Sequence, residues 1–92
     1  MGQVNFERYE KQILSNKVSE RRKQINGLKG HLVLIEFSRD MGEVEKGTLV
    51  RGNIRCNYIS GKGIFSLEGK FLEDISTLDF NPNEVNGIYR RY

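Results

Sequence analysis

A two-residue alternation runs through Thr48–Ile59, TLVRGNIRCNYI, and it limits the fold more than any other feature of this sequence. One set of alternate positions reads Thr48, Val50, Gly52, Ile54, Cys56 and Tyr58, and the other reads Leu49, Arg51, Asn53, Arg55, Asn57 and Ile59. Successive side chains of a β-strand point to opposite faces, so the pattern predicts one long strand whose first set of side chains lies on a core. This strand is expected in the middle of a small antiparallel sheet. Cys56, between two apolar neighbours of the first set, is expected to be buried and unreactive.

An N-terminal helix is predicted over residues 5–26, because this stretch lacks proline and glycine and is rich in Glu, Lys, Arg and Gln. Asn26 and Gly27 supply its stop signal. Its apolar residues fall on two faces about 100° apart at the helical period, Phe6, Tyr9 and Ile13 on one and Leu14, Val18 and Ile25 on the other. We therefore expect the helix to pack on the sheet rather than to form a free arm.

The remaining apolar runs predict further strands. His31–Phe37 is apolar on nearly both faces, so this strand needs cover from two layers. A turn is predicted at residues 60–63, and Ile64–Leu72 follows it, with core candidates Phe65, Leu67 and Phe71. A second turn is predicted to begin at Glu73, and Ile75–Phe80 follows it. Residues 81–92 form a C-terminal tail whose last residues, 88–92, predict one more short strand. The expectation is a single α+β domain over residues 1–92, with the sheet in residues 31–80.

The segment EGKFLEDISTLDF resembles the closing part of Sm-like and SH3-like small β-barrels. In such barrels a strand ends in a hydrophobic and acidic turn before a short strand with alternate apolar residues, a pattern that Phe71, Leu72, Asp74, Ile75, Leu78 and Phe80 fill. For residues 28–80 the resemblance implies a barrel of four to five strands. An open antiparallel sheet flanked by the helix fits the same residues. The uridine-binding loop of Sm-like proteins is not evident, so no RNA-binding residue is carried over.

The composition excludes several classes of protein. The chain has one cysteine, Cys56, and one histidine, His31, so it has neither an internal disulfide nor the ligands of a structural zinc site. No apolar run approaches the roughly 20 residues of a membrane span. We expect a cytoplasmic protein of bacterial or phage-like style, with no cofactor, metal or membrane partner. Because no group of candidate catalytic side chains stands out, an enzyme is not expected either.

The positive charge is concentrated near the N-terminus, where residues 1–30 carry seven basic and three acidic side chains. Residues 31–92 carry eight basic and nine acidic side chains. Such asymmetry favours an acidic partner, although a solvated basic helix without a partner would look the same. Likewise, the cluster Arg21, Arg22 and Lys23 forms a secondary basic patch or merely complements the dipole of the predicted helix.

The expected working surface is the polar face of the long strand together with the C-terminal tail. Its predicted binding residues are Arg51, Asn53, Arg55, Asn57, Tyr89, Arg90, Arg91 and Tyr92. Arginine and tyrosine are common anchors of protein interfaces. This favours a small protein-binding adaptor or inhibitor, phage-type in style, that docks on a larger protein, for example one that handles nucleic acid. The alternative is an Sm-like protein that binds RNA or DNA through the same basic and aromatic residues. A face that only keeps the sheet soluble is the third interpretation.

Overall fold

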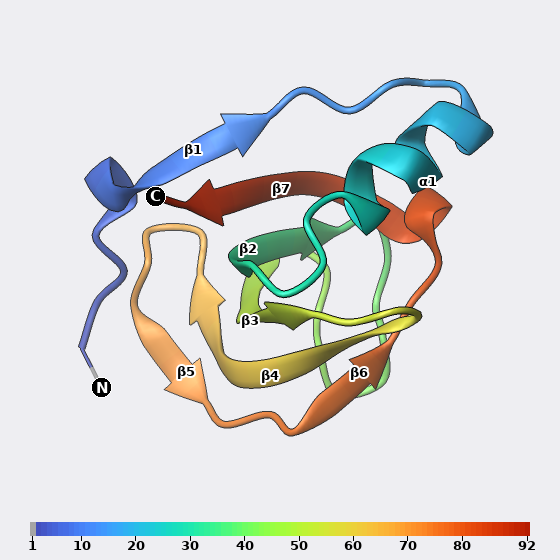
Figure 1. Cartoon of the computed structure of the whole chain (residues 1–92). Coiled ribbons are helices and arrows are strands. Elements are labelled where there is room, and N and C mark those ends of the chain that lie inside the picture. Colours follow the sequence, from blue (N-terminus) through green and yellow to red (C-terminus); the bar gives the residue numbers. More distant parts are fainter. Residues whose placement is uncertain (1) are drawn as a thin grey trace.

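The computed structural model describes residues 2–92, so Met1, which the predicted domain includes, lies outside the described residues. These residues form one α-helix and seven antiparallel strands, which confirms the predicted α+β class but exceeds the expected four to five strands (Figure 1). The helix is α1 (Val18–Asn26), and two 3-10 turns are η1 (Phe6–Arg8) and η2 (Pro82–Glu84). The strands are β1 (Tyr9–Gln12), β2 (Leu32–Phe37), β3 (Thr48–Ile54), β4 (Tyr58–Ser66), β5 (Phe71–Glu73), β6 (Thr77–Asp79) and β7 (Val85–Arg91).

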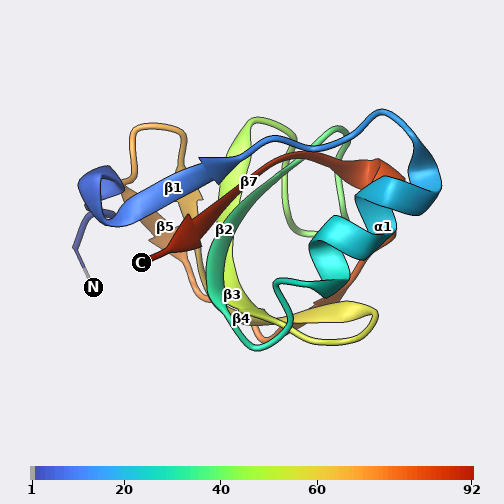
Figure 2. The same ribbon diagram turned by 45° about the horizontal axis from the view of Figure 1, so that its top comes forward.

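The seven strands form one strongly curved sheet in the order β1-β7-β2-β3-β4-β5, and β6 pairs with the first part of β4. The C-terminal strand β7, predicted as a short strand over residues 88–92 of a tail, spans Val85–Arg91 and lies inside the sheet between β1 and β2 (Figure 2). β1 and β5 are the two ends of this path. Near them, the isolated bridge Gln3–Lys70 joins the residues that precede each strand. The pairing thus shows an open sheet, and closure into the small barrel implied by the resemblance is not shown.

The predicted N-terminal helix is wrong over residues 5–17. Residues 5–26 divide into η1, β1 and α1, and only the last of these is α-helical. The residue types of this stretch favour a helix locally, but β7 offers β1 a continuous partner from Tyr9–Arg91 to Gln12–Ile88. Pairing with a distant strand therefore overrides the helix propensity. Consequently Ile13, which was expected to pack on the sheet, is 89% exposed.

The predicted long strand over residues 48–59 is also wrong, because it is interrupted after Ile54. The chain turns over residues 55–57 and returns as β4, with Ile54 opposite Ile59 and the Arg55 N–H donating to the Tyr58 carbonyl at 2.8 Å. The alternation of polar and apolar residues simply continues through the turn, so it gives no signal of the reversal. Cys56 lies in this turn and is exposed, which contradicts its predicted burial.

The turn expected at residues 60–63 is instead a bulge within β4. Arg51 pairs with Gly63 and Gly52 with Gly61, so Lys62 is the extra residue. At Gly52 the two backbones approach so closely that a Cβ would collide with the Ser60 carbonyl and lie 2.9 Å from Ile59 Cγ1. The bulge lets β4 pair first with β6 and then with β5. The strand predicted over residues 64–72 is also wrong, because a turn after Ser66, in which the Gly69 N–H donates to the Ser66 carbonyl, divides it between β4 and β5. Leu67, a predicted core residue, lies in this turn and is 49% exposed.

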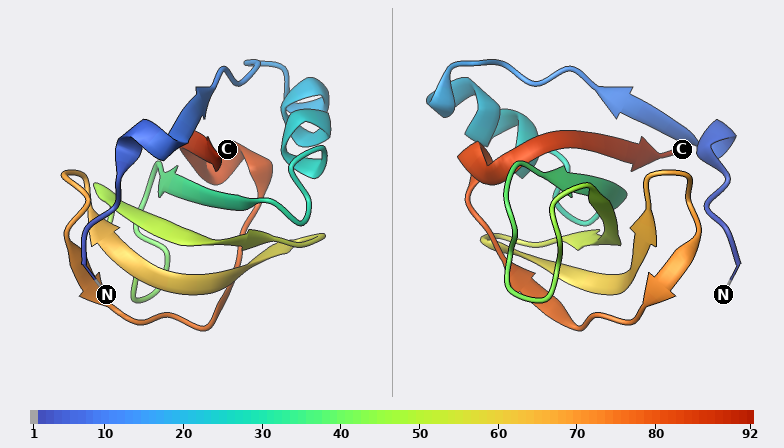
Figure 3. Two further views of the ribbon diagram at one scale, coloured as in Figure 1. Left: turned by 60° about the vertical axis from the view of Figure 1, so that its left-hand side comes forward. Right: turned by 180° about the vertical axis from the view of Figure 1, so that it is seen from behind.

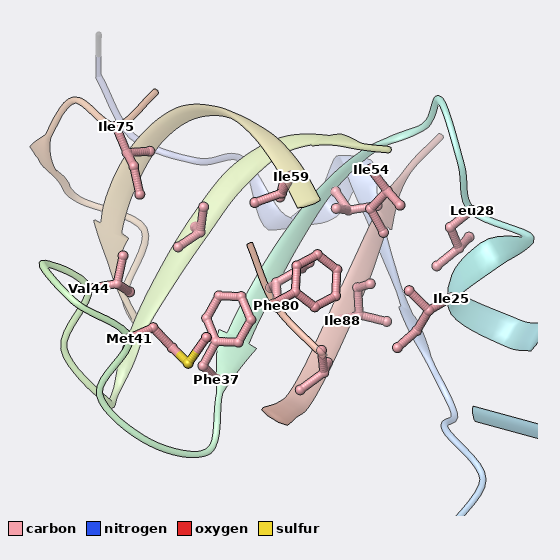
Figure 4. Packing of buried hydrophobic residues seen from close by; sticks show 14 of the residues in the cluster. Ile25, Leu28, Phe37, Met41, Val44, Ile54, Ile59, Ile75, Phe80 and Ile88 are labelled. Atoms are coloured by element: carbon pink, nitrogen blue, oxygen red, sulfur yellow. The ribbon is translucent and has the colours of Figure 1, made fainter. Parts of the chain in front are cut away.

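Two apolar clusters lie on opposite faces of the sheet. The first cluster consists of Ile25, Leu28, Val33, Ile35, Phe37, Met41, Val44, Val50, Ile54, Ile59, Ile64, Ile75, Phe80, Val85 and Ile88. Figure 4 shows Ile25 and Leu28, from α1 and the turn after it, at one end of this cluster, and Met41, Val44 and Ile75 at the other. The connection over residues 38–47, which carries two of these residues, arches beside the strands (Figure 3, right).

The second cluster is smaller and consists of Val4, Leu34, Leu49 and Phe65, with Phe6, Tyr9, Phe71 and Tyr89 packed around them. β2 contributes to both clusters, since Val33, Ile35 and Phe37 enter the first and Leu34 enters the second. The prediction that this strand is buried on both faces is confirmed. The helix was expected to cover one face, and Ile25 does so, whereas the N-terminal residues before β1 cover the other.

Candidate functional site

The strand register gathers basic and polar residues from three strands on one face of the sheet. Lys11 of β1 pairs with Tyr89 of β7, Tyr89 pairs with Leu34 of β2, and Leu34 pairs with Arg51 of β3. Directly opposite residues of paired strands share a face, so Lys11, Tyr89 and Arg51 point to the same side. Alternation along β7 and β3 adds Arg91 and Asn53 to this side. We call these five residues, Lys11, Arg51, Asn53, Tyr89 and Arg91, the basic face.

Four of these residues were predicted from the sequence, and Lys11 was missed. Arg51, Asn53, Tyr89 and Arg91 were expected on one working surface, and the register places their strands two positions apart in the sheet. Lys11 was assigned to a helix, so nothing in the local pattern linked it to Tyr89. With strands about 4.8 Å apart, the face extends roughly 14 Å from β1 to β3.

The cations of the basic face have no neutralising ion pair in the part of the chain that the structure describes. Among residues 2–92, ion pairs engage Lys17, Arg39 and Arg90, but none engages Lys11, Arg51 or Arg91. Arg51 is half-buried, and its Nε is enclosed without a hydrogen-bond partner in the described residues. The face can therefore donate charged hydrogen bonds to an acidic group.

The structure separates the other predicted binding residues from this face. Arg90 pairs with Val33, so it points to the opposite side, and its Nη2 lies 3.3 Å from Glu10 Oε1. Tyr92 is 71% exposed just beyond the end of β7. Arg55 and Asn57 lie in the turn between β3 and β4 and do not continue the row of Arg51 and Asn53. The predicted eight-residue surface is therefore not one patch.

A groove of about 700 Å³ lies where α1, the 55–57 turn and η2 meet. Its lining comprises Arg22, Ile25, Asn26, Arg39, Met41, Cys56, Asn57, Asp79, Phe80, Asn81, Pro82 and Glu84. The backbone N–H of Asn81 donates to the Glu84 carboxylate at 2.8 Å, and together with the paired Arg39 this lowers the pKa of Glu84 below its usual value, against the effect of burial. Because two arginines face two carboxylates, the groove has no net charge to select a charged ligand.

The secondary basic patch at residues 21–23 has three different environments. Arg21 is half-buried and donates hydrogen bonds to the carbonyls of Ser15, Pro82 and Val85, so it fixes α1 to the chain around η2. Arg22 is exposed at the groove, and Lys23 is exposed on α1. Arg21 thus has a structural role that the dipole interpretation did not include.

Within residues 2–92, no group of three or more His, Cys, Asp or Glu side chains is arranged to hold a metal ion. The helices of the same residues are all too short and too polar to cross a membrane. No protein-family model matches the chain, and comparison with curated proteins and with solved structures gives no significant match.

Proposed function

We propose that this protein is a small, non-catalytic binding module that docks its basic face on an acidic surface of a larger protein, as an adaptor or an inhibitor. The observation that carries the proposal is the convergence of Lys11, Arg51 and Arg91 on one face without a neutralising ion pair among the described residues. Unpaired cations beside tyrosine and asparagine form the kind of surface that anchors protein interfaces.

Two tyrosines on this side of the sheet, Tyr89 of the basic face and Tyr9 opposite Arg91, favour a protein partner over a nucleic acid. Single-stranded nucleic acids bind to small sheets by stacking bases on open aromatic rings. Here Tyr9 and Tyr89 are half-buried in the second cluster, and Phe6 meets Tyr89 edge to face with the ring centroids 6.2 Å apart.

Nucleic acid remains the second candidate, because three unpaired cations would attract phosphates as well as carboxylates. In this alternative the chain would act as an RNA- or DNA-binding protein of the Sm-like type. Its signature would be an affinity that falls steeply as the salt concentration rises, by several orders of magnitude for many phosphate contacts.

A capture experiment with matched variants tests the proposal. The double variant Arg51→Met, Arg91→Met removes two cations but keeps their unbranched stems, and Lys46→Met, Lys62→Met removes two exposed cations elsewhere. The parent and the control are expected to retain one protein from an extract of the native cells, after nuclease treatment as well. The first variant should bind it at least tenfold more weakly, equivalent to about 1.4 kcal/mol.

Two results would overturn the proposal. Loss of every partner on nuclease treatment would favour the nucleic-acid role. If the folded Arg51→Met, Arg91→Met variant bound its partner as tightly as the parent, the site would lie elsewhere, and the groove beside α1 would be tested next.

A further inference from the structure

We propose that the open edge of β1 binds an extended acidic segment of the partner protein as an additional antiparallel or parallel strand. This inference rests on the proposed function and names the form of the partner. β1 is the end of the strand path, so within residues 2–92 its outer edge pairs with no other strand. An edge of this kind offers backbone hydrogen bonds to an incoming peptide.

The hydrogen-bond pattern shows which groups face this edge. The Tyr92 N–H donates to the Arg8 carbonyl at 3.0 Å, one step beyond the Tyr9–Arg91 pair. Hydrogen-bonded pairs alternate along antiparallel strands, so Glu10 also turns its backbone toward β7. Lys11 therefore directs its N–H and C=O groups to the open edge, while its side chain lies on the basic face.

The charges of the face define the incoming strand. A residue added opposite Lys11 would lie about 4.8 Å from it, and Arg91 would lie one strand further away on the same side. Acidic residues at alternate positions of the partner would therefore meet both cations. The acidic residue of β1, Glu10, is on the other side and is already paired with Arg90.

A second copy of this chain fits the edge poorly. In a symmetric antiparallel pair, residues that oppose one another must share a face, so Lys11 can oppose Tyr9, Lys11 or Ile13 of the copy but never Glu10. Such a dimer would also bring the two sets of unpaired cations together. The charge thus favours an acidic strand from another protein.

An exposed isoleucine directly after β1 adds an apolar contact point. Ile13 is 89% exposed, yet its backbone is held: the Gln24 Nε2 donates to the Ile13 carbonyl at 2.7 Å, and the Ser15 N–H donates to Gln24 Oε1 at 2.8 Å. An immobilised, solvent-exposed isoleucine loses little further backbone entropy on binding. The incoming segment is therefore expected to combine alternate acidic residues with one apolar residue that reaches Ile13.

Two synthetic peptides test this mode of binding with the full-length protein. The first alternates glutamate and valine, and the second has the same sequence with N-methyl groups on alternate residues, which block the hydrogen bonds of one strand edge. The first peptide should slow hydrogen exchange of the Lys11 amide, and the methylated one should bind at least tenfold more weakly. Lys11→Glu should weaken binding of the first peptide at least tenfold, whereas the exposed-lysine control Lys62→Glu should bind as the parent does.

The contrary results separate this inference from the proposed function. Equal binding of both peptides would overturn strand addition but leave the basic face as the site. Strand addition would also be overturned, and the basic face would remain the site, if neither peptide bound while the double variant Arg51→Met, Arg91→Met still lost the native partner. A parent that forms a dimer in sedimentation experiments, and becomes monomeric with Lys11→Glu, would overturn the inference in favour of a second copy.

Discussion

The two apolar clusters share β2 but differ in how they are enclosed. The first cluster receives buried side chains from four of the seven strands, β2, β3, β4 and β7, and from the connections between strands, and it is closed at one end by α1. The second cluster has only four buried residues, and its cover is the short segment before β1. That segment is tied to the sheet by the Val4 N–H, which donates to the Gly69 carbonyl at 2.8 Å, and by the Gln3–Lys70 bridge.

This difference suggests that one cluster stabilises the fold and that the other lies at the binding surface. Completely enclosed apolar side chains contribute most to the free energy of unfolding, whereas regions with few buried contacts open locally at lower cost. The second cluster lies on the same side of the sheet as the basic face, with Leu34 between Tyr89 and Arg51 in the register, and it adjoins β1, where we place partner binding. We therefore expect the first cluster to hold the fold and the second to tolerate change.

The largest expected effect comes from Ile88→Ala in the first cluster. Ile88 is 0% exposed, so its truncation leaves a cavity and should lower the free energy of unfolding by about 3 kcal/mol, measured by urea denaturation. Ile13→Ala removes the same atoms from an exposed site and should change the free energy of unfolding by less than about 0.5 kcal/mol. Similar losses for both variants would mean that the first cluster is not the stabilising core.

A smaller effect is expected from Arg21→Met at the edge of the first cluster. The change abolishes hydrogen bonds to three carbonyls, and the free energy of unfolding should fall by about 2 kcal/mol. The adjacent Arg22→Met is the matched control, with an expected change within about 0.5 kcal/mol. If thermal or urea melts gave the two variants equal stability, α1 would not be anchored through Arg21.

Phe6→Ala examines the second cluster directly. Phe6 is half-buried against Tyr89, so Phe6→Ala should lower the free energy of unfolding by about 1 kcal/mol. This decrease is smaller than that expected for a fully enclosed side chain. Hydrogen exchange should quicken in β1 and remain unchanged at the centre of β2. A loss as large as that of Ile88→Ala, or faster exchange throughout the sheet, would remove the distinction between the two clusters.

The smallest effect on stability is expected at Cys56, which lies outside both clusters. Because this thiol is exposed in the 55–57 turn, a thiol reagent should label the native protein nearly as fast as the denatured one. Cys56→Ser should alter the free energy of unfolding by less than about 0.5 kcal/mol. Slow labelling that accelerates only in denaturant would show that the turn is enclosed.

Much of the strand content could be predicted because alternation and apolar runs are local signals. Val33, Ile35 and Phe37 lie on one face of β2 and Leu34 lies on the other, so the strand needs a packing layer on each face. Both layers are present. Arg51 and Asn53 could be assigned to one face from their spacing alone. The reversal after Ile54 could not, because Arg55, Cys56 and Asn57 continue the same alternation.

By itself the sequence determined the α+β class, the double burial of β2 and the common face of Arg51 and Asn53, since each follows from the period of neighbouring side chains. Only the tertiary structure decided that residues 9–12 form a strand and that Lys11 lies beside Tyr89. Both depend on the pairing of β1 with β7, two strands that lie near opposite ends of the sequence. Such pairing supplies hydrogen bonds and packing that no local pattern encodes, and these outweigh the helix propensity of the N-terminal segment.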